Sequence, residues 1–183
     1  MDLADLLPIA AFVALAAGLV VVFRGTARIA ARSREINQFR GGVKDLAARV
    51  DASIGSAAGQ IDAVRHQLAG PELIAQSVVD ATEALERFGD EARALAGPRR
   101  ALAIRDDLLA ELDRASRALG MVEHGANILA SSRRGSRDLE AQTSIKRGYL
   151  NLIHARDAIA RQALRAETMA VEEIAAERTR FGV

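Results

Sequence analysis

Apolar residues recur along most of the chain with the spacing of an α-helix. From Ile36 to Leu68 they are separated by steps of three and four residues, which is the pattern of a helix with one apolar stripe that packs against another helix. The step of four occurs twice in succession after Leu46, a stutter that weakens left-handed supercoiling. The pattern predicts a long helix over residues 29–69.

Three further segments carry a similar stripe, and none of them alternates with the period of a strand. Gly70-Pro71 and Gly97-Pro98 separate the first three helices, either as tight turns or as kinks in a longer bent helix. Small, polar and basic residues at 131–137 predict a loop before the last helix. The three further helices are expected at residues 71–96, 98–130 and 138–179.

The stripes of these four helices form the predicted packing seam. A helix with one apolar face is marginally stable alone in water, so the seam must be covered by the other helices, by a second copy or by another protein. The expected fold is all-α, an elongated helical bundle or coiled coil whose pairing direction the pattern leaves open. The seam residues are Ile36, Phe39, Val43, Leu46, Val50, Ile74, Val78, Leu85, Phe88, Leu95, Leu108, Leu112, Leu119, Ile145, Leu152 and Ile159.

A different pattern occupies the N-terminal end. Residues 6–23 form a run of 18 residues without a charge, which as a helix is about 27 Å long, close to the thickness of a bilayer's hydrocarbon core. No face of this run carries the polar stripe of a helix in a soluble bundle or in the membrane interface. A cleaved signal peptide fits poorly, because Asp2 stands where a basic residue is typical. We therefore expect a transmembrane helix.

Basic residues follow the apolar run directly and predict its orientation. Residues 24–44 hold six bases and one acid, and an excess of Lys and Arg is typical of the cytoplasmic side of a span. We expect residues 1–5 outside the membrane and residues 45–183, the helical bundle, in the cytoplasm. Arginine greatly outnumbers lysine, a bias that GC-rich bacterial coding sequences produce, so the expected location is a bacterial inner (plasma) membrane.

Two features of this basic segment, residues 24–44, have expected roles. Anionic lipid headgroups attract each surface base by about 1 kcal/mol, and two adjacent glycines weaken one turn of a helix. Gly41-Gly42 therefore predicts a hinge between anchor and bundle. The residues expected to contact the membrane surface are Arg24, Arg28, Arg32 and Arg34.

Composition narrows the fold and the chemistry. Aromatic residues make up 3% of the chain and prolines number three, which disfavours a β-sandwich or barrel. Cysteine is absent, so disulfides, thiolate metal sites and a cysteine nucleophile are excluded. The formal net charge is +1, which gives no general electrostatic reason for a nucleic-acid partner.

The search for catalytic or ligand-binding patterns finds none. His66, His124 and His154 lie far apart and belong to no metal-binding spacing. Asp106 and Asp107 are adjacent, and neighbours on a helix point about 100° apart, so they do not converge on one site. We expect no catalytic residue, no cofactor and no metal, and therefore no enzyme.

The sequence favours a membrane-anchored helical scaffold, tether or small accessory subunit. It would act through contacts with itself or with another helical protein, beside a bilayer with anionic headgroups. The alternative is a signal-relay component that transmits changes through its coiled-coil stalk. A nucleic-acid-binding role for the loop with Arg133, Arg134 and Arg137 ranks below both, because residues 45–183 hold 21 acids and 19 bases and the loop has no aromatic residue for base stacking.

Overall fold

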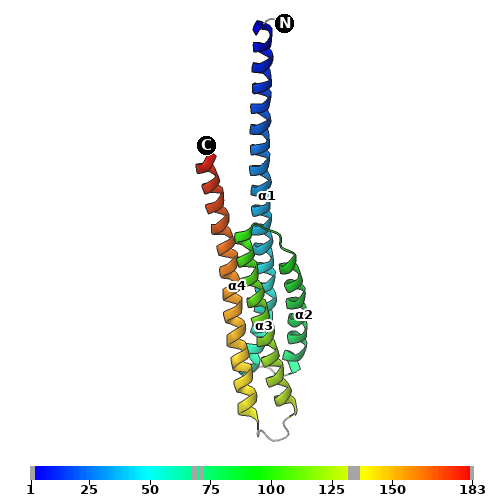
Figure 1. Cartoon of the computed structure of the whole chain (residues 1–183). Helices are drawn as coiled ribbons and strands as arrows, with labels where there is room; N and C mark the ends of the chain where they lie inside the picture. The colour runs from blue at the N-terminus through cyan, green and yellow to red at the C-terminus, as the bar shows by residue number, and fades with distance from the viewer. Residues whose placement is uncertain (1–2, 67–69, 71, 132–136, 182–183) are drawn as a thin grey trace.

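The computed structural model of the chain contains four α-helices and no strand among the residues that it describes, which confirms the all-α fold class (Figure 1). The structure describes residues 3–66, 70, 72–131 and 137–181. Before residue 30 it describes the side chains of residues 12, 15, 16, 19, 20, 23, 24, 26 and 27, and in the last helix those up to residue 169. The helices are α1 (Leu3–Arg65), α2 (Glu72–Ala94), α3 (Arg99–Ser131) and α4 (Asp138–Phe181).

The four helices form an antiparallel bundle in which the chain reverses direction after each helix (Figure 1). α1 packs against α2 and α4, α3 packs against the same two helices, and α1 and α3 touch across the centre. The chain therefore reverses direction between α1 and α2 and between α2 and α3 and does not continue as one bent helix; residues 67–69 and 71 of the first junction lie outside the described residues. Short connections between antiparallel neighbours are typical of up-and-down bundles.

The apolar stripes of the four helices meet in a single core. The stripe of α1 is buried from Ile36 to Val64, and a shorter stripe of α2 faces it from Ile74 to Ala92. Alanine occupies many positions between the large side chains, and small residues let the helices approach closely at the expense of apolar area in each layer. The core is therefore long and thin, as the narrow stripes indicated.

α3 and α4 approach each other closely at two buried glycines. A Cβ on Gly125 of α3 would lie 2.7 Å from the carbonyl oxygen of Ala141 on α4. A Cβ on Gly148 of α4 would lie 2.7 Å from the carbonyl oxygen of Ala118 on α3. Because both contacts involve backbone atoms, which cannot move aside cheaply, no other residue type fits these positions without separating the helices.

α1 differs from its expected division into separate segments. It is one helix that passes without interruption through Gly41 and Gly42, so the predicted hinge is not a break in the structure. Packing explains why position 42 is a glycine, because a Cβ there would lie 2.7 Å from Cδ2 of Leu95. The cost of glycine in a helix, about 1 kcal/mol, is outweighed by the contacts that α1 makes along the bundle.

The N-terminal part of α1 extends well past the other three helices (Figure 1). Its described large apolar side chains, Phe12, Leu15, Leu19, Val20 and Phe23, are 52–75% exposed. A search of the described residues finds no helix with a stretch long and apolar enough to cross a membrane. Most side chains of the predicted span, residues 6–23, lie outside the described ones.

Candidate interaction surfaces

The structure buries the predicted seam residues in the core of the bundle. Fifteen of the sixteen are at most 8% exposed. Leu95 is the exception: it follows the end of α2, is partly buried and packs against the edge of the core. No group of three or more His, Asp or Glu among the described residues could hold a metal ion.

The basic residues predicted to contact a membrane lie on the part of α1 that precedes the bundle. Arg24, Arg32 and Arg34 are exposed, and the side chain of Arg28 lies outside the described ones. Ile36, two residues after Arg34, is the first fully buried position among the described side chains of α1. The predicted contact residues therefore separate the apolar segment from the bundle.

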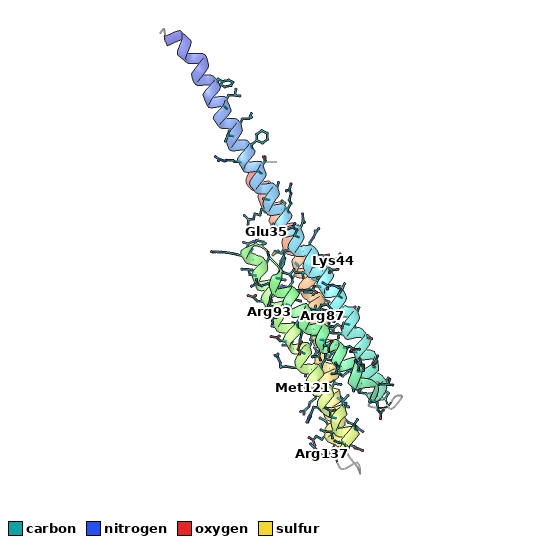
Figure 2. The ribbon with its side chains drawn as sticks, turned by 90° about the vertical axis from the view of Figure 1, so that its right-hand side faces the viewer. Glu35, Lys44, Arg87, Arg93, Met121 and Arg137 are labelled. Carbon is teal, nitrogen blue, oxygen red and sulfur yellow. The ribbon has the colours of Figure 1, made fainter. Side chains whose placement is uncertain are left out.

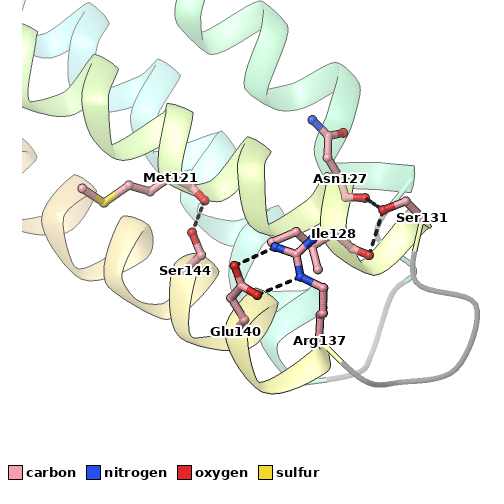
Figure 3. A network of polar contacts seen from close by, with 7 residues as sticks. All are labelled: Met121, Asn127, Ile128, Ser131, Arg137, Glu140 and Ser144. Atoms are coloured by element: carbon pink, nitrogen blue, oxygen red, sulfur yellow. Dashed lines mark hydrogen bonds and ion pairs between the residues drawn. The ribbon is translucent and has the colours of Figure 1, made fainter.

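The basic loop before α4 is only partly described. Arg133 and Arg134 lie outside the described residues. The Nε and Nη2 atoms of Arg137 each donate a hydrogen bond of 2.8 Å to the carboxylate of Glu140 (Figure 3). This pairing, helped by the charge of His124, holds the pKa of Glu140 below its usual value. The charge of Arg137 is thus balanced within the chain, which weakens the case for a nucleic-acid site here.

A groove between α3 and α4 lies at the same end of the bundle. It measures about 570 Å³ and has Met121 and Leu139 among its walls, with Thr143 and Arg147 alongside. Ser144 also lines the groove. Its hydroxyl donates a 2.7 Å hydrogen bond to the carbonyl oxygen of Met121 (Figure 3). Sequence reasoning missed this groove, because it depends on which residues of α3 and α4 are placed side by side.

Ion pairs between the helices fix their register. Lys44 Nζ of α1 lies 3.0 Å from Oε1 of Glu167 on α4, and Figure 2 shows Lys44 on the outer side of α1. Asp51 of α1 pairs with Arg156 of α4. On the other side of α1, Arg49 binds Glu91 of α2. Arg49 also lies 5.4 Å from the centre of the Phe88 ring, so that one cation meets both a carboxylate and an aromatic face.

The pair of Asp51 and Arg156 predicts an acid-sensitive part of the stability. The hydrogen bond from Arg156 lowers the pKa of Asp51 below its usual value of 3.8. A carboxylate whose pKa is lowered by folding contributes its full stability at pH values above its usual pKa. This contribution is lost as the pH falls through the lowered pKa of the folded protein. Since the pair is partly exposed, we expect this contribution to be about 0.5 kcal/mol.

We therefore expect Asp51→Asn to lower the free energy of unfolding near pH 7 and to reduce its decline below about pH 4. Denaturant unfolding at several pH values measures both effects. Arg156→Gln is the matched variant, and the double variant should lose no more than either single variant. Fully additive losses would show that the two side chains do not interact in solution.

Comparison of the chain with known protein families, with curated protein sequences and with solved structures finds no match. The chain offers three candidate interaction surfaces: the exposed apolar segment of α1, the basic residues after it, and the outer faces of the bundle.

Proposed function

We propose that this chain is a membrane-anchored helical scaffold or tether that acts through protein–protein contacts and has no catalytic activity. Residues 6–23 form its single transmembrane span, with the N-terminus outside and the bundle in the cytoplasm of a bacterial cell. Anionic headgroups of the inner leaflet contact the arginines that follow the span. The bundle is held beside the membrane, where its outer faces are open to partners.

One observation carries this proposal: large apolar side chains are exposed on a helix that extends beyond its own bundle. Phe12 is 75% and Phe23 68% exposed, and burial of apolar surface is worth about 25 cal/mol for each Å². Phe12, Leu15, Leu19 and Phe23 belong to the N-terminal part of α1, which extends past the other three helices (Figure 1). Residues 6–23 carry no charge on any side of the helix, and lipid covers every side of a helix, whereas a protein partner covers one.

The order of the residues along α1 supports the same proposal. The uncharged run ends at Phe23, and Arg24 begins the basic segment. Among the side chains that the structure describes, core burial begins at Ile36. The intervening residues, about 18 Å of helix, place the bundle at a short distance from the bilayer surface. α1 is also continuous from Leu3 to Arg65, so span and bundle move as one helix.

Extraction of isolated membranes with alkaline carbonate tests the anchor. We expect the full chain to remain in the membrane pellet. Leu15→Arg with Leu19→Arg should move it to the supernatant, because each arginine at the centre of a span costs about 3 kcal/mol. Ala27→Arg with Ala30→Arg adds the same charge at exposed positions after the span and should leave the chain in the pellet. A parent chain that appears in the supernatant would disprove the anchor.

A further inference from the structure

The outer face of α2 is acidic. Its exposed residues that point away from the core, within about 60° of the direction of Glu83, include five acids and one base. Asp90 is paired with Arg93 of the same helix, and the other charged residues of this face form no salt bridge with a residue that the structure describes. We call the exposed residues the α2 face: Glu72, Gln76, Val79, Asp80, Glu83, Glu86, Arg87, Asp90 and Ala94.

The outer face of α4 is basic. Its exposed residues within about 60° of the direction of Leu150 include four bases and one acid. Ile153 borders this face, but it packs against the core of its own bundle and does not belong to it. Arg165 is paired with Asp107 of α3, and the other charged residues of the face form no salt bridge within the described part of the chain. We call the exposed residues the α4 face: Leu139, Thr143, Lys146, Arg147, Leu150, His154, Asp157, Arg161, Leu164, Arg165 and Thr168.

The α2 face and the α4 face lie on opposite sides of the same bundle. α2 and α4 each pack against α1 and α3, whereas the described residues of α2 make no contact with those of α4. Figure 1 shows the two helices at opposite edges of the bundle. Both run in the same direction, because each is antiparallel to α1 (Figure 1). The bundle therefore carries negative charge on one side and positive charge on the other.

The two faces also lie at the same level along the bundle. Arg49 of α1 binds Glu91 of α2. Asp51, two residues further along α1, pairs with Arg156 of α4. Counted from these two pairs, the centres of the α2 face and the α4 face lie within about 6 Å of the same level. Two copies placed side by side in the same orientation therefore bring the acidic face of one against the basic face of the other.

We propose that copies of this chain associate side by side in one membrane, with the α2 face of one copy on the α4 face of the next. This inference rests on the proposed anchor, because a single span in one membrane gives every copy the same orientation. Surfaces of opposite charge attract each other and favour this arrangement. Two α2 faces or two α4 faces placed together would repel each other, which excludes the alternatives.

Each face also has an exposed apolar side chain among its charged residues. Val79 of the α2 face and Leu150 of the α4 face are both 45% exposed. By the same count along the helices, the two lie about one helical turn apart in height. In the proposed arrangement they therefore meet across the contact, with charged residues around them. An apolar centre with a polar rim is the usual composition of a protein interface.

The association does not stop at two copies, because each copy offers two different faces. A contact between unlike surfaces produces either a closed ring or an open row. Since α2 and α4 lie on opposite sides of the bundle (Figure 1), successive copies are displaced along one line. The proposed scaffold is therefore a row of bundles in the plane of the membrane.

Reversing the charge of the α2 face gives the first test variant. Asp80→Lys, Glu83→Lys and Glu86→Lys together make this face basic, and we call the chain the α2-reversed variant. These residues form no salt bridge within the described part of the bundle, so the variant should keep its fold, which circular dichroism checks. Alone, it should associate more weakly than the parent by about tenfold or more, because both of its faces are then basic.

Reversing the charge of the α4 face gives the matched variant. Lys146→Glu, Arg147→Glu and Arg161→Glu together make the α4-reversed variant, whose two faces are both acidic, and alone it should associate as weakly. An equal mixture of the two variants should recover the association of the parent, because every basic face then meets an acidic one. Light scattering of the full chains in mild detergent measures the association. No recovery in the mixture overturns the proposal. A loss in only one variant also overturns it, because that face would then have a different partner, such as anionic lipid.

Cysteine cross-linking locates the contact, because the chain has no cysteine of its own. A mixture of the Val79→Cys and Leu150→Cys chains should form a covalent dimer with a short bifunctional maleimide reagent, and neither variant alone should. The chain with both substitutions should give a ladder of longer products, because each copy then joins two neighbours. No dimer from the mixture, or a dimer from either variant alone, overturns the proposal. A doubly substituted chain that stops at dimers overturns the row.

Liposomes that carry the full chain separate this proposal from the proposed anchor. Flotation reports insertion into the bilayer, and cross-linking of the floated Val79→Cys and Leu150→Cys chains reports the contact between the two faces. Chains that float but do not cross-link overturn the side-by-side association and leave the anchor standing. Chains that cross-link in detergent but do not float overturn the anchor and leave the contact between the α2 face and the α4 face standing.

Discussion

Replacing Gly125 with alanine is expected to lower the free energy of unfolding by about 3 kcal/mol, although alanine is the better helix former. The new Cβ would lie 2.7 Å from the carbonyl oxygen of Ala141 and 3.1 Å from the backbone nitrogen of Ile145. Neither atom belongs to a side chain that can rotate away. α3 and α4 must therefore separate, and the packing of Leu119 and Leu152 nearby is lost with them.

Gly120 supplies the matched control on the same helix. Nothing lies within 4 Å of a Cβ built there, so Gly120→Ala adds a helix-favouring residue without a clash. We expect it to raise the free energy of unfolding by about 0.5–1 kcal/mol. Denaturant unfolding of the full chain, followed by circular dichroism, measures both variants. Equal effects of the two substitutions would show that α3 and α4 are less closely packed than the structure indicates.

The buried stripe of each helix could be predicted from the sequence because it depends on one helix at a time. The steps of three and four residues from Ile36 to Val64 identify the buried face of α1 whatever covers it. The same reasoning placed Leu108 and Leu119 in the core of α3 and Ile159 in the core of α4. Periodicity reports which side of a helix is apolar, and burial follows from that.

The pairing of the helices could not be predicted, because it depends on residues far apart in the chain. The pair of Lys44 and Glu167 spans more than a hundred positions, and many other acids and bases could have met instead. The same limit applies to the glycines. A Cβ built on Gly41 has nothing within 4 Å, whereas one built on Gly125 meets backbone atoms. The two glycines nevertheless look alike in the sequence. Only the position of the neighbouring helix separates a tolerant glycine from a required one.

The predicted hinge and the groove illustrate two further limits. The local cost of adjacent glycines predicts a hinge at Gly41 and Gly42, whereas the structure shows a continuous helix there that packs on α2 and α4. The groove beside Met121 and Leu139 depends on which residues of α3 and α4 the bundle places side by side. Both outcomes are set by tertiary packing, which overrides local preferences.

The double substitution Leu85→Asp with Phe88→Asp is expected to abolish cooperative unfolding of the bundle. The two side chains are 3% and 8% exposed, and loss of a buried leucine or phenylalanine costs about 2–5 kcal/mol each. Two carboxylates without partners in the same layer add a further penalty. The summed loss in the free energy of unfolding equals or exceeds the total stability of a typical domain, about 5–15 kcal/mol.

Glu86→Gln with Arg87→Gln is the control, because both residues lie between Leu85 and Phe88 on the exposed side of α2. It changes the same number of residues in the same turn and should shift the unfolding midpoint only slightly. Thermal unfolding followed by circular dichroism compares the two variants with the parent chain. Because Phe88 also lies under Arg49, Phe88→Leu should keep the bundle folded with a smaller loss. A double aspartate variant that unfolds as cooperatively as the parent would show that the stripe of α2 does not face the core.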